Sequence, residues 1–211
     1  MSDDHRAGLL VIDVQNDFFA GGALPVSNAD RVVSALNRYI DEGVDHGVAI
    51  YASRDWHPSV SNHFKTYGGP WPSHCVRGTE GARFHPNIRL PATAIVITKG
   101  EESTSPGYSA CEGRTPAGKP FLTDLRERGV GHLYVGGLAT DYCVKHSVLD
   151  ALSAGLQVTL LEDAIAGVDP EGSVRAIVEM RRSGARVAAG LGLFVERTVH
   201  GQDHRQQTHC L

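Results

Sequence analysis

The sequence predicts a three-layer α/β fold around a largely parallel sheet. Six short apolar runs recur at wide spacing along the 211 residues, and most are continuous rather than alternating, which is typical of strands covered on both faces. Segments with helical periodicity lie between several of these runs. Strands that alternate with helices favour a parallel sheet with helices packed on both sides.

The expected strands are short aliphatic runs with few charges. In chain order they are Gly8–Val14, Val48–Ala52, Ala94–Thr98, His132–Gly136, Leu156–Leu161 and Ala185–Ala189. The first expected helix carries an apolar stripe from Ala29 to Ile40, with Ser27 and Asp30 as its capping pair. Gly43 is its expected end, because glycine commonly terminates helices.

Two further helices are expected after the fourth and fifth strands. The stripe from Val144 to Leu152 indicates one of them, with Thr140 or Asp141 as its N-cap and Gly155 just past its end. Asp169-Pro170 is a cap followed by a first-turn proline, which predicts that the last helix begins there.

Two irregular stretches break this alternation. They are residues 54–90, which are rich in His, Pro, Trp and Gly, and residues 101–119. Loops of this length in a compact domain are usually functional. The polar segment 200–211 has no periodicity, so we expect a flexible tail there.

Length and composition indicate a single globular domain, residues 1–211, of 22.6 kDa. The net charge of −4 and the pI near 6.2 offer no basic surface for nucleic acid, and the longest nearly uncharged apolar run, Val187–Val195, is too short to span a membrane. The four cysteines form no C-x-x-C pair, and no secretion signal precedes the first strand. We therefore expect a cytoplasmic protein with reduced thiols, and a homo-oligomer is a further expectation because such assemblies are common among soluble enzymes.

Residues that directly follow the strands are the candidates for chemistry, because open α/β sheets bind ligands at the carboxyl ends of their strands. Cys143 falls in the first turn of the helix after the fourth strand, where backbone N–H groups and the positive helix end stabilise a thiolate or an oxyanion. A free cysteine is more often a buried structural residue. The Gly136-Gly137 pair and the polar Thr140-Asp141-Tyr142 run before the thiol favour a nucleophile.

Asp13 and Lys99 complete a candidate triad with Cys143. Each follows an apolar run, so we expect each charge to lie in a dry environment and to need a partner. The Asp13 carboxylate is then the general base, and Lys99 is its cation. For either residue singly, a buried ion pair at a strand end is an equally good interpretation.

A group of metal-binding side chains lies in the first irregular stretch. Asp55, His57, His63 and His74 supply one carboxylate and three imidazoles within twenty residues. This donor set suits Zn, Fe or Mn. A single solvated histidine carries little information, but the cluster favours a metal site. Cys75 adjoins His74 but should point away from it, because neighbours in an extended segment face opposite ways.

Together these motifs resemble the nicotinamidase/pyrazinamidase branch of the isochorismatase-like cysteine hydrolases. The metal motif separates nicotinamidases from most relatives, which share only the triad. The matching stretches follow the family's order between residue 9 and about residue 190, and they are Asp13–Phe18 with Gly21-Gly22, Asp55–His63, Trp71–Thr79, Lys99-Gly100 and Gly137–Val144.

The resemblance implies a Rossmann-like, mainly parallel sheet of six strands in the order 3-2-1-4-5-6, with a cis peptide between Leu138 and Ala139. The family's catalytic triad matches Asp13, Lys99 and Cys143, and its oxyanion donors match the backbone N–H groups of Ala139 and Cys143.

The resemblance also implies a metal site and a substrate pocket. The family's metal ligands match Asp55, His57 and His74, and His63 matches a further ligand that only some members use. The pocket residues match Phe18, Leu24, Trp71, Tyr108 and Tyr142. Cys111 stands where some members carry an aromatic residue, so one wall of the pocket differs from theirs.

The activity implied is that of a metal-dependent cysteine amidase that converts nicotinamide, and also pyrazinamide, to the carboxylate and ammonia through a thioester, a reaction of NAD salvage. Its expected cofactor is one divalent metal ion, zinc before iron or manganese. A related hydrolase of carbamoyl or ureido compounds is the alternative. A non-catalytic metal-binding or redox-sensing protein is a remote one, because it leaves Asp13 and Lys99 without a role.

Overall fold

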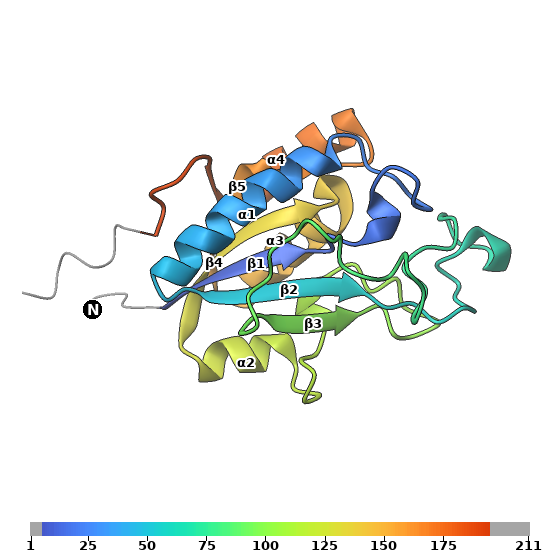
Figure 1. Cartoon of the computed structure of the whole chain (residues 1–211), viewed down its shortest axis with the longest axis horizontal. Helices are drawn as coiled ribbons and strands as arrows, with labels where there is room; N and C mark the ends of the chain where they lie inside the picture. The colour runs from blue at the N-terminus through green and yellow to red at the C-terminus, as the bar shows by residue number, and fades with distance from the viewer. Residues whose placement is uncertain (1–5, 195–211) are drawn as a thin grey trace, which may run out of the picture.

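The computed structural model describes residues 6–194, so the expected tail at 200–211 lies outside the described residues. It contains a six-stranded parallel sheet in the order β3-β2-β1-β4-β5-β6, which confirms the predicted fold class and strand order (Figure 1). All six predicted strands are present, as β1 (Arg6–Ile12), β2 (Ala49–Asp55), β3 (Ile95–Lys99), β4 (Val130–Leu138), β5 (Gln157–Ala166) and β6 (Arg186–Ala188).

Helices cover both faces of this sheet. They are α1 (Ala29–Asp45), α2 (Phe121–Glu127), α3 (Lys145–Ser153) and α4 (Pro170–Arg182). The apolar stripe of α1 forms one core with one face of the sheet, and the apolar residues of α2, α3 and α4 form a second core with the other face. Figure 1 shows α1 and α2 on opposite sides of the strands. Because Leu9 to Ile12 of β1 alternate between these two cores, all four side chains are fully buried.

The capping signals were right for the last helix and wrong for the first. Asp169 caps α4, because its carboxylate accepts the N–H of Gly172 at 2.6 Å. Helix α1 has no side-chain cap at its start, where Asn28 adopts a left-handed φ of 64°. It also continues through Gly43, which is buried in the close packing of α1 against Ile50.

The expected N-caps of α3 were also wrong. A π-helical turn, Thr140–Val144, precedes α3, and no side chain caps it. The Asp141 carboxylate instead accepts the backbone N–H groups of Val168 and Asp169 from the loop after β5. Helix α2 was not predicted, because it has only seven residues and no side-chain cap.

The two irregular stretches of the sequence are long loops in the structure, apart from two short 3-10 turns. The loop between β2 and β3 projects beyond the carboxyl ends of these two strands, where the arrowheads point in Figure 1. No helix within residues 6–194 has the length and apolar character needed to cross a membrane. Assignment of the whole chain, residues 1–211, to a single domain stays a prediction.

Candidate active site

The ends of β1 and β4 bring two predicted site residues together. β1 ends at Ile12, and Asp13 then turns the chain with a left-handed φ of 49°. Gly137 of β4 pairs with Ile12 at a φ of 131°, and a Cβ at this glycine would lie 2.1 Å from the Ile12 carbonyl oxygen. Only glycine fits such a close approach. The turn that carries Cys143 therefore starts directly beside Asp13.

Lys99, at the end of β3, reaches both neighbouring carboxylates. Its Nζ lies 2.8 Å from Asp13 Oδ2 and 2.6 Å from Asp55 Oδ1. The same ammonium donates to Cys143 Sγ at 3.4 Å and to the Gly107 carbonyl at 3.1 Å. Lys99 and Asp13 have no exposed side-chain surface, so these charges interact in a dry environment and compensate one another. The structure thus brings the three predicted triad residues into one cluster.

Burial and charge set the protonation states of this cluster. Burial raises the pKa of Asp13, against the opposing effect of the Lys99 ammonium. Burial alone would lower the pKa of Lys99, but the Asp13 and Asp55 carboxylates outweigh it and raise that pKa well above its usual value. Burial also raises the pKa of Cys143 well above its usual value, although Lys99 opposes it. In the resting state Lys99 is therefore a permanent cation and Cys143 is a neutral thiol.

Cys143 lies in the π-helical turn that leads into α3. The Val144 N–H donates to the Ala139 carbonyl at 3.1 Å, which is the i to i−5 bond of a π-turn. The peptide between Leu138 and Ala139 is cis, as the resemblance implied. Ala139 and Cys143 both line the same cavity, and their roles as oxyanion donors stay a prediction.

Three histidines form a second cluster beside the first. The ligand nitrogens of His57, His63 and His74 all lie within 4.8 Å of one another. Asp55 links the two clusters, because its Oδ1 accepts from Lys99 while its Oδ2 lies 3.7 Å from His57 Nε2. The four residues predicted as metal ligands are therefore neighbours in the structure.

The ring orientations fit a divalent metal ion. His57 Nδ1 lies 3.0 Å from the Gly100 carbonyl and His74 Nδ1 lies 2.9 Å from the Pro72 carbonyl, and a carbonyl can only accept, so each Nδ1 carries the proton. Each Nε2 is then left with a lone pair. Within residues 6–194, the buried His57 Nε2 has no hydrogen-bond partner, which is costly unless a ligand such as a metal occupies that direction.

The electrostatic environment favours the neutral form of His63 and His74. Burial, with a smaller contribution from His57, lowers the pKa of His63 to about 3. Burial likewise lowers the pKa of His74. Neutral imidazole is the form that binds metals, so neither ring must first lose a proton near neutral pH.

The two clusters meet at one cavity, which Cys143 lines from the first cluster and His63 and His74 line from the second. Trp71 Nε1 donates to the Tyr108 hydroxyl at 2.9 Å across this cavity, and the Trp71 and Tyr142 rings meet edge to face. All five residues predicted for the pocket line it, and they are Phe18, Leu24, Trp71, Tyr108 and Tyr142.

Two details of this cavity differ from the sequence prediction. Val168, in the loop after β5, also lines the cavity but was not among the predicted residues. Val168 lies two residues after the end of β5 at Ala166, whereas the predicted fifth strand ended at Leu161, so the sequence did not place Val168 at a strand end. Cys111, expected at the pocket wall, is absent from the cavity lining among the described residues, and its Sγ lies 3.8 Å from the Ser147 carbonyl instead.

Fold and site together define a class of protein, namely hydrolases with a parallel α/β sheet and a buried cysteine at its carboxyl edge. The Isochorismatase domain model matches residues 7–190, so the chain belongs to the isochorismatase family. Over 195 residues the chain is 42% identical to the nicotinamidase of Escherichia coli, a match that covers 84% of this chain and 92% of that protein. It is 40% identical over 176 residues to the nicotinamidase/pyrazinamidase of Mycobacterium tuberculosis, covering 82% and 93% of the two chains.

Solved structures agree with this assignment. The pyrazinamidase of Pyrococcus horikoshii in complex with zinc superimposes with a TM-score of 0.81 at 42% identity, covering 88% of this chain and 99% of that one. The PnC1 protein of L. infantum in complex with nicotinate gives a TM-score of 0.79 at 32% identity, with coverages of 88% and 93%.

Proposed function

We propose that this protein is a nicotinamidase, which hydrolyses nicotinamide, and also pyrazinamide, to the corresponding carboxylate and ammonia. The observation that carries this proposal is that two clusters meet at one aromatic cavity. Asp55 links the Asp13–Lys99–Cys143 cluster to the His57–His63–His74 cluster, and Cys143, His63 and His74 line the cavity. The names of the relatives from E. coli and M. tuberculosis and the nicotinate complex from L. infantum support the same substrate.

Cys143 is the proposed nucleophile and Asp13 its base. Asp13 removes the thiol proton, and the sulfur attacks the carboxamide carbon. Burial raises the pKa of Asp13, so its carboxylate is a stronger base than a solvated one. Burial also raises the pKa of the Cys143 thiol, so the thiol loses its proton only to a base that is held close to it. Lys99 stays charged throughout and stabilises the negative charge that moves between Asp13 and Cys143.

The backbone N–H groups of Ala139 and Cys143 are the proposed donors to the oxyanion that forms on the carboxamide oxygen. Collapse of that intermediate breaks the C–N bond, and Asp13 delivers its proton to the departing ammonia. Water then hydrolyses the thioester, with Asp13 again accepting a proton, and the free thiol is restored.

Asp55, His57, His63 and His74 would hold a divalent metal, for which we propose zinc. The nitrogen and oxygen donors suit zinc, and the zinc complex of the P. horikoshii pyrazinamidase supports it. Such an ion supplies a Lewis acid at the edge of the substrate cavity.

A Cys143→Ala variant tests the proposed reaction by release of ammonia from nicotinamide. Cys111→Ala is the matched control, because it removes a thiol that lies outside the cavity lining. We expect no turnover for the first variant and wild-type turnover for the second. Retained turnover in Cys143→Ala would refute the mechanism, and faster turnover of N-carbamoyl compounds than of nicotinamide and pyrazinamide would refute the substrate.

A further inference from the structure

Strand β2 extends further than its neighbour β1. The last pair of residues in their register is Val11 with Ala52, whereas β2 continues to Asp55. On that side of β2, the peptide groups of Asp55 therefore lie beyond the end of the partner strand. Asp55 is buried, so unpaired N–H and C=O groups there would be costly.

The side chain of Gln15 makes the hydrogen bonds to Asp55 that a longer β1 would otherwise make. Its Oε1 accepts the Asp55 N–H at 2.8 Å, and its Nε2 donates to the Asp55 carbonyl at 2.8 Å and to the Ala82 carbonyl at 2.9 Å. The partners fix which end of the amide is oxygen, since one donor faces Oε1 and two acceptors face Nε2. Gln15 is fully buried, and its three side-chain hydrogen bonds join Asp55 of β2 to the loop residue Ala82.

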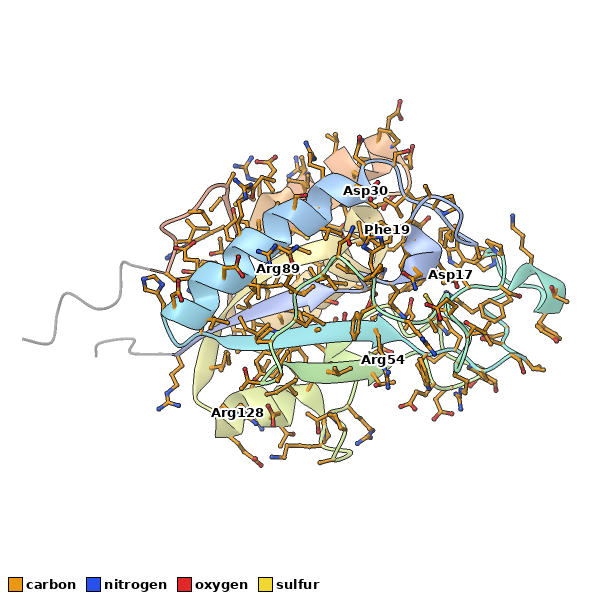
Figure 2. The ribbon with its side chains drawn as sticks, viewed as in Figure 1. Asp17, Phe19, Asp30, Arg54, Arg89 and Arg128 are labelled. Carbon is orange, nitrogen blue, oxygen red and sulfur yellow. The ribbon has the colours of Figure 1, made fainter. Side chains whose placement is uncertain are left out.

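Asp17 holds the segment of another predicted ligand in the same way. Its Oδ2 accepts the Cys75 N–H at 2.7 Å, and its Oδ1 accepts the Ala23 N–H at 3.1 Å. Cys75 adopts a left-handed φ of 45° and directly follows His74. The Cys75 carbonyl in turn accepts the His57 N–H at 3.0 Å. Figure 2 labels Asp17 at the carboxyl end of the sheet.

We propose that Gln15 and Asp17 are positioning residues for the metal site. Gln15 fixes the backbone of Asp55, and Asp17 fixes the Cys75 N–H next to His74. Because the Cys75 carbonyl accepts the His57 N–H, Asp17 also acts on the segment that carries His57. The segment that carries Asp13 thereby sets the spacing of ligands at the end of β2 and in the long loop that follows it. This inference rests on the metal site of the proposed function, but it does not depend on the identity of the substrate.

Metal affinity measured without substrate tests this proposal. Zinc binding to the full chain is followed by competition with a chromophoric chelator, and the absorption spectrum of the cobalt-loaded protein reports on coordination geometry. The variants are Gln15→Met, which keeps the size and removes three hydrogen bonds, and Asp17→Asn, which removes one acceptor. We expect zinc to bind roughly 10- to 100-fold more weakly to each and the cobalt bands to shift, because partners of metal ligands typically contribute that much.

Asn16→Leu is the matched control. Asn16 belongs to the same segment, and its Nδ2 donates to the Glu80 carbonyl at 2.9 Å, but this bond is exposed and reaches no predicted ligand. We expect wild-type zinc affinity for this variant. Circular dichroism establishes folding of each protein, and the shorter amide of Gln15→Asn replaces Gln15→Met if the latter does not fold.

The outcomes separate this proposal from the proposed function. Unchanged zinc affinity and an unchanged cobalt spectrum in the folded Gln15 and Asp17 variants would overturn the positioning role alone. Equal weakening in Asn16→Leu would overturn it as well, because the effect would then not be specific to ligand-bearing segments. A wild-type protein that binds neither zinc nor cobalt would overturn the metal site and this inference together, whatever its activity on nicotinamide.

Discussion

Lys99 Nζ lies 2.6 Å from Asp55 Oδ1, so the ammonium that faces the proposed base also neutralises a proposed metal ligand. Both carboxylates of this group are buried with Lys99, so the three groups carry a net negative charge when both carboxylates are ionised. A bound divalent cation would offset that charge. Charge balance therefore gives a physical reason, besides the donor set, for the thiol cluster and the histidine cluster to occur together.

Replacement of Lys99 by methionine should destabilise the fold as well as abolish activity. Two buried carboxylates would lose the ammonium that contacts both of them, and removal of one partner from a buried ion pair typically costs about 3–5 kcal/mol. Lys119→Met is the control, because Lys119 is partly exposed and pairs with Glu127 at the surface, where ion pairs contribute little to stability. Urea unfolding checks this prediction, and similar losses for the two variants would contradict it.

An Asp13→Asn variant should retain the fold and lose the general base. The amide has the size of the carboxylate, and its oxygen can still accept the Ser53 hydroxyl that lies 2.7 Å from Oδ1. We expect kcat/KM for nicotinamide to fall by about 10²- to 10⁴-fold, the usual contribution of a general base. Ser53→Ala removes only the hydrogen bond and should cost about tenfold or less. A smaller loss for Asp13→Asn than for Ser53→Ala would argue against Asp13 as the base.

The sheet and the two clusters could be predicted because they depend on rules that act over short stretches of sequence. Continuous apolar runs identified all six strands, and parallel topology brings the residues after those strands to one edge. Asp13 directly follows β1, Lys99 ends β3, and Cys143 lies in the turn after β4, so the parallel topology places all three at the same edge of the sheet.

Side-chain hydrogen bonds to segments that are distant in the sequence could not be predicted. Asp141 is a good N-cap residue by type, but backbone N–H groups from the loop after β5 take its carboxylate instead. Gln15 lies in a recognised motif, yet its hydrogen bonds depend on how far β2 extends beyond β1. In both cases a polar side chain had several local partners, and a segment distant in sequence determined which one it bonds.

Asp141 should influence substrate binding through Val168. Its two carboxylate oxygens accept the Val168 and Asp169 N–H groups at 3.0 and 2.9 Å, and Val168 lines the cavity. In an Asp141→Asn variant one of these N–H groups would face an NH₂ group. Loss of a charged hydrogen bond costs about 1.5–3 kcal/mol, so we expect KM for nicotinamide to rise about tenfold or more with a smaller change in kcat.

Asp163→Asn is the matched control for that measurement. Asp163 also accepts hydrogen bonds, from the Tyr39 hydroxyl at 2.7 Å and from the Gly190 N–H, but it does not line the cavity. KM should therefore stay at its wild-type value in this variant. An unchanged KM in Asp141→Asn would contradict the role assigned to the loop after β5.

The Cys111 thiol should make the free energy of unfolding fall as the pH rises above about 9. Burial raises the pKa of its thiol from the usual 9.0 to about 12 in the folded protein, against a weaker opposing hydrogen bond from Ser109. Between these values the unfolded chain loses the proton and the folded chain keeps it, so this stabilising contribution is complete below pH 9.0 and declines as pH rises towards about 12. One such thiol contributes a slope of up to about 1.4 kcal/mol per pH unit.

Cys111→Ala should therefore show a shallower fall in unfolding free energy between about pH 9 and pH 10.5, measured by urea unfolding under reducing conditions. The other cysteines are present in both proteins, so the difference in slope isolates Cys111, and parallel slopes would contradict its retained proton.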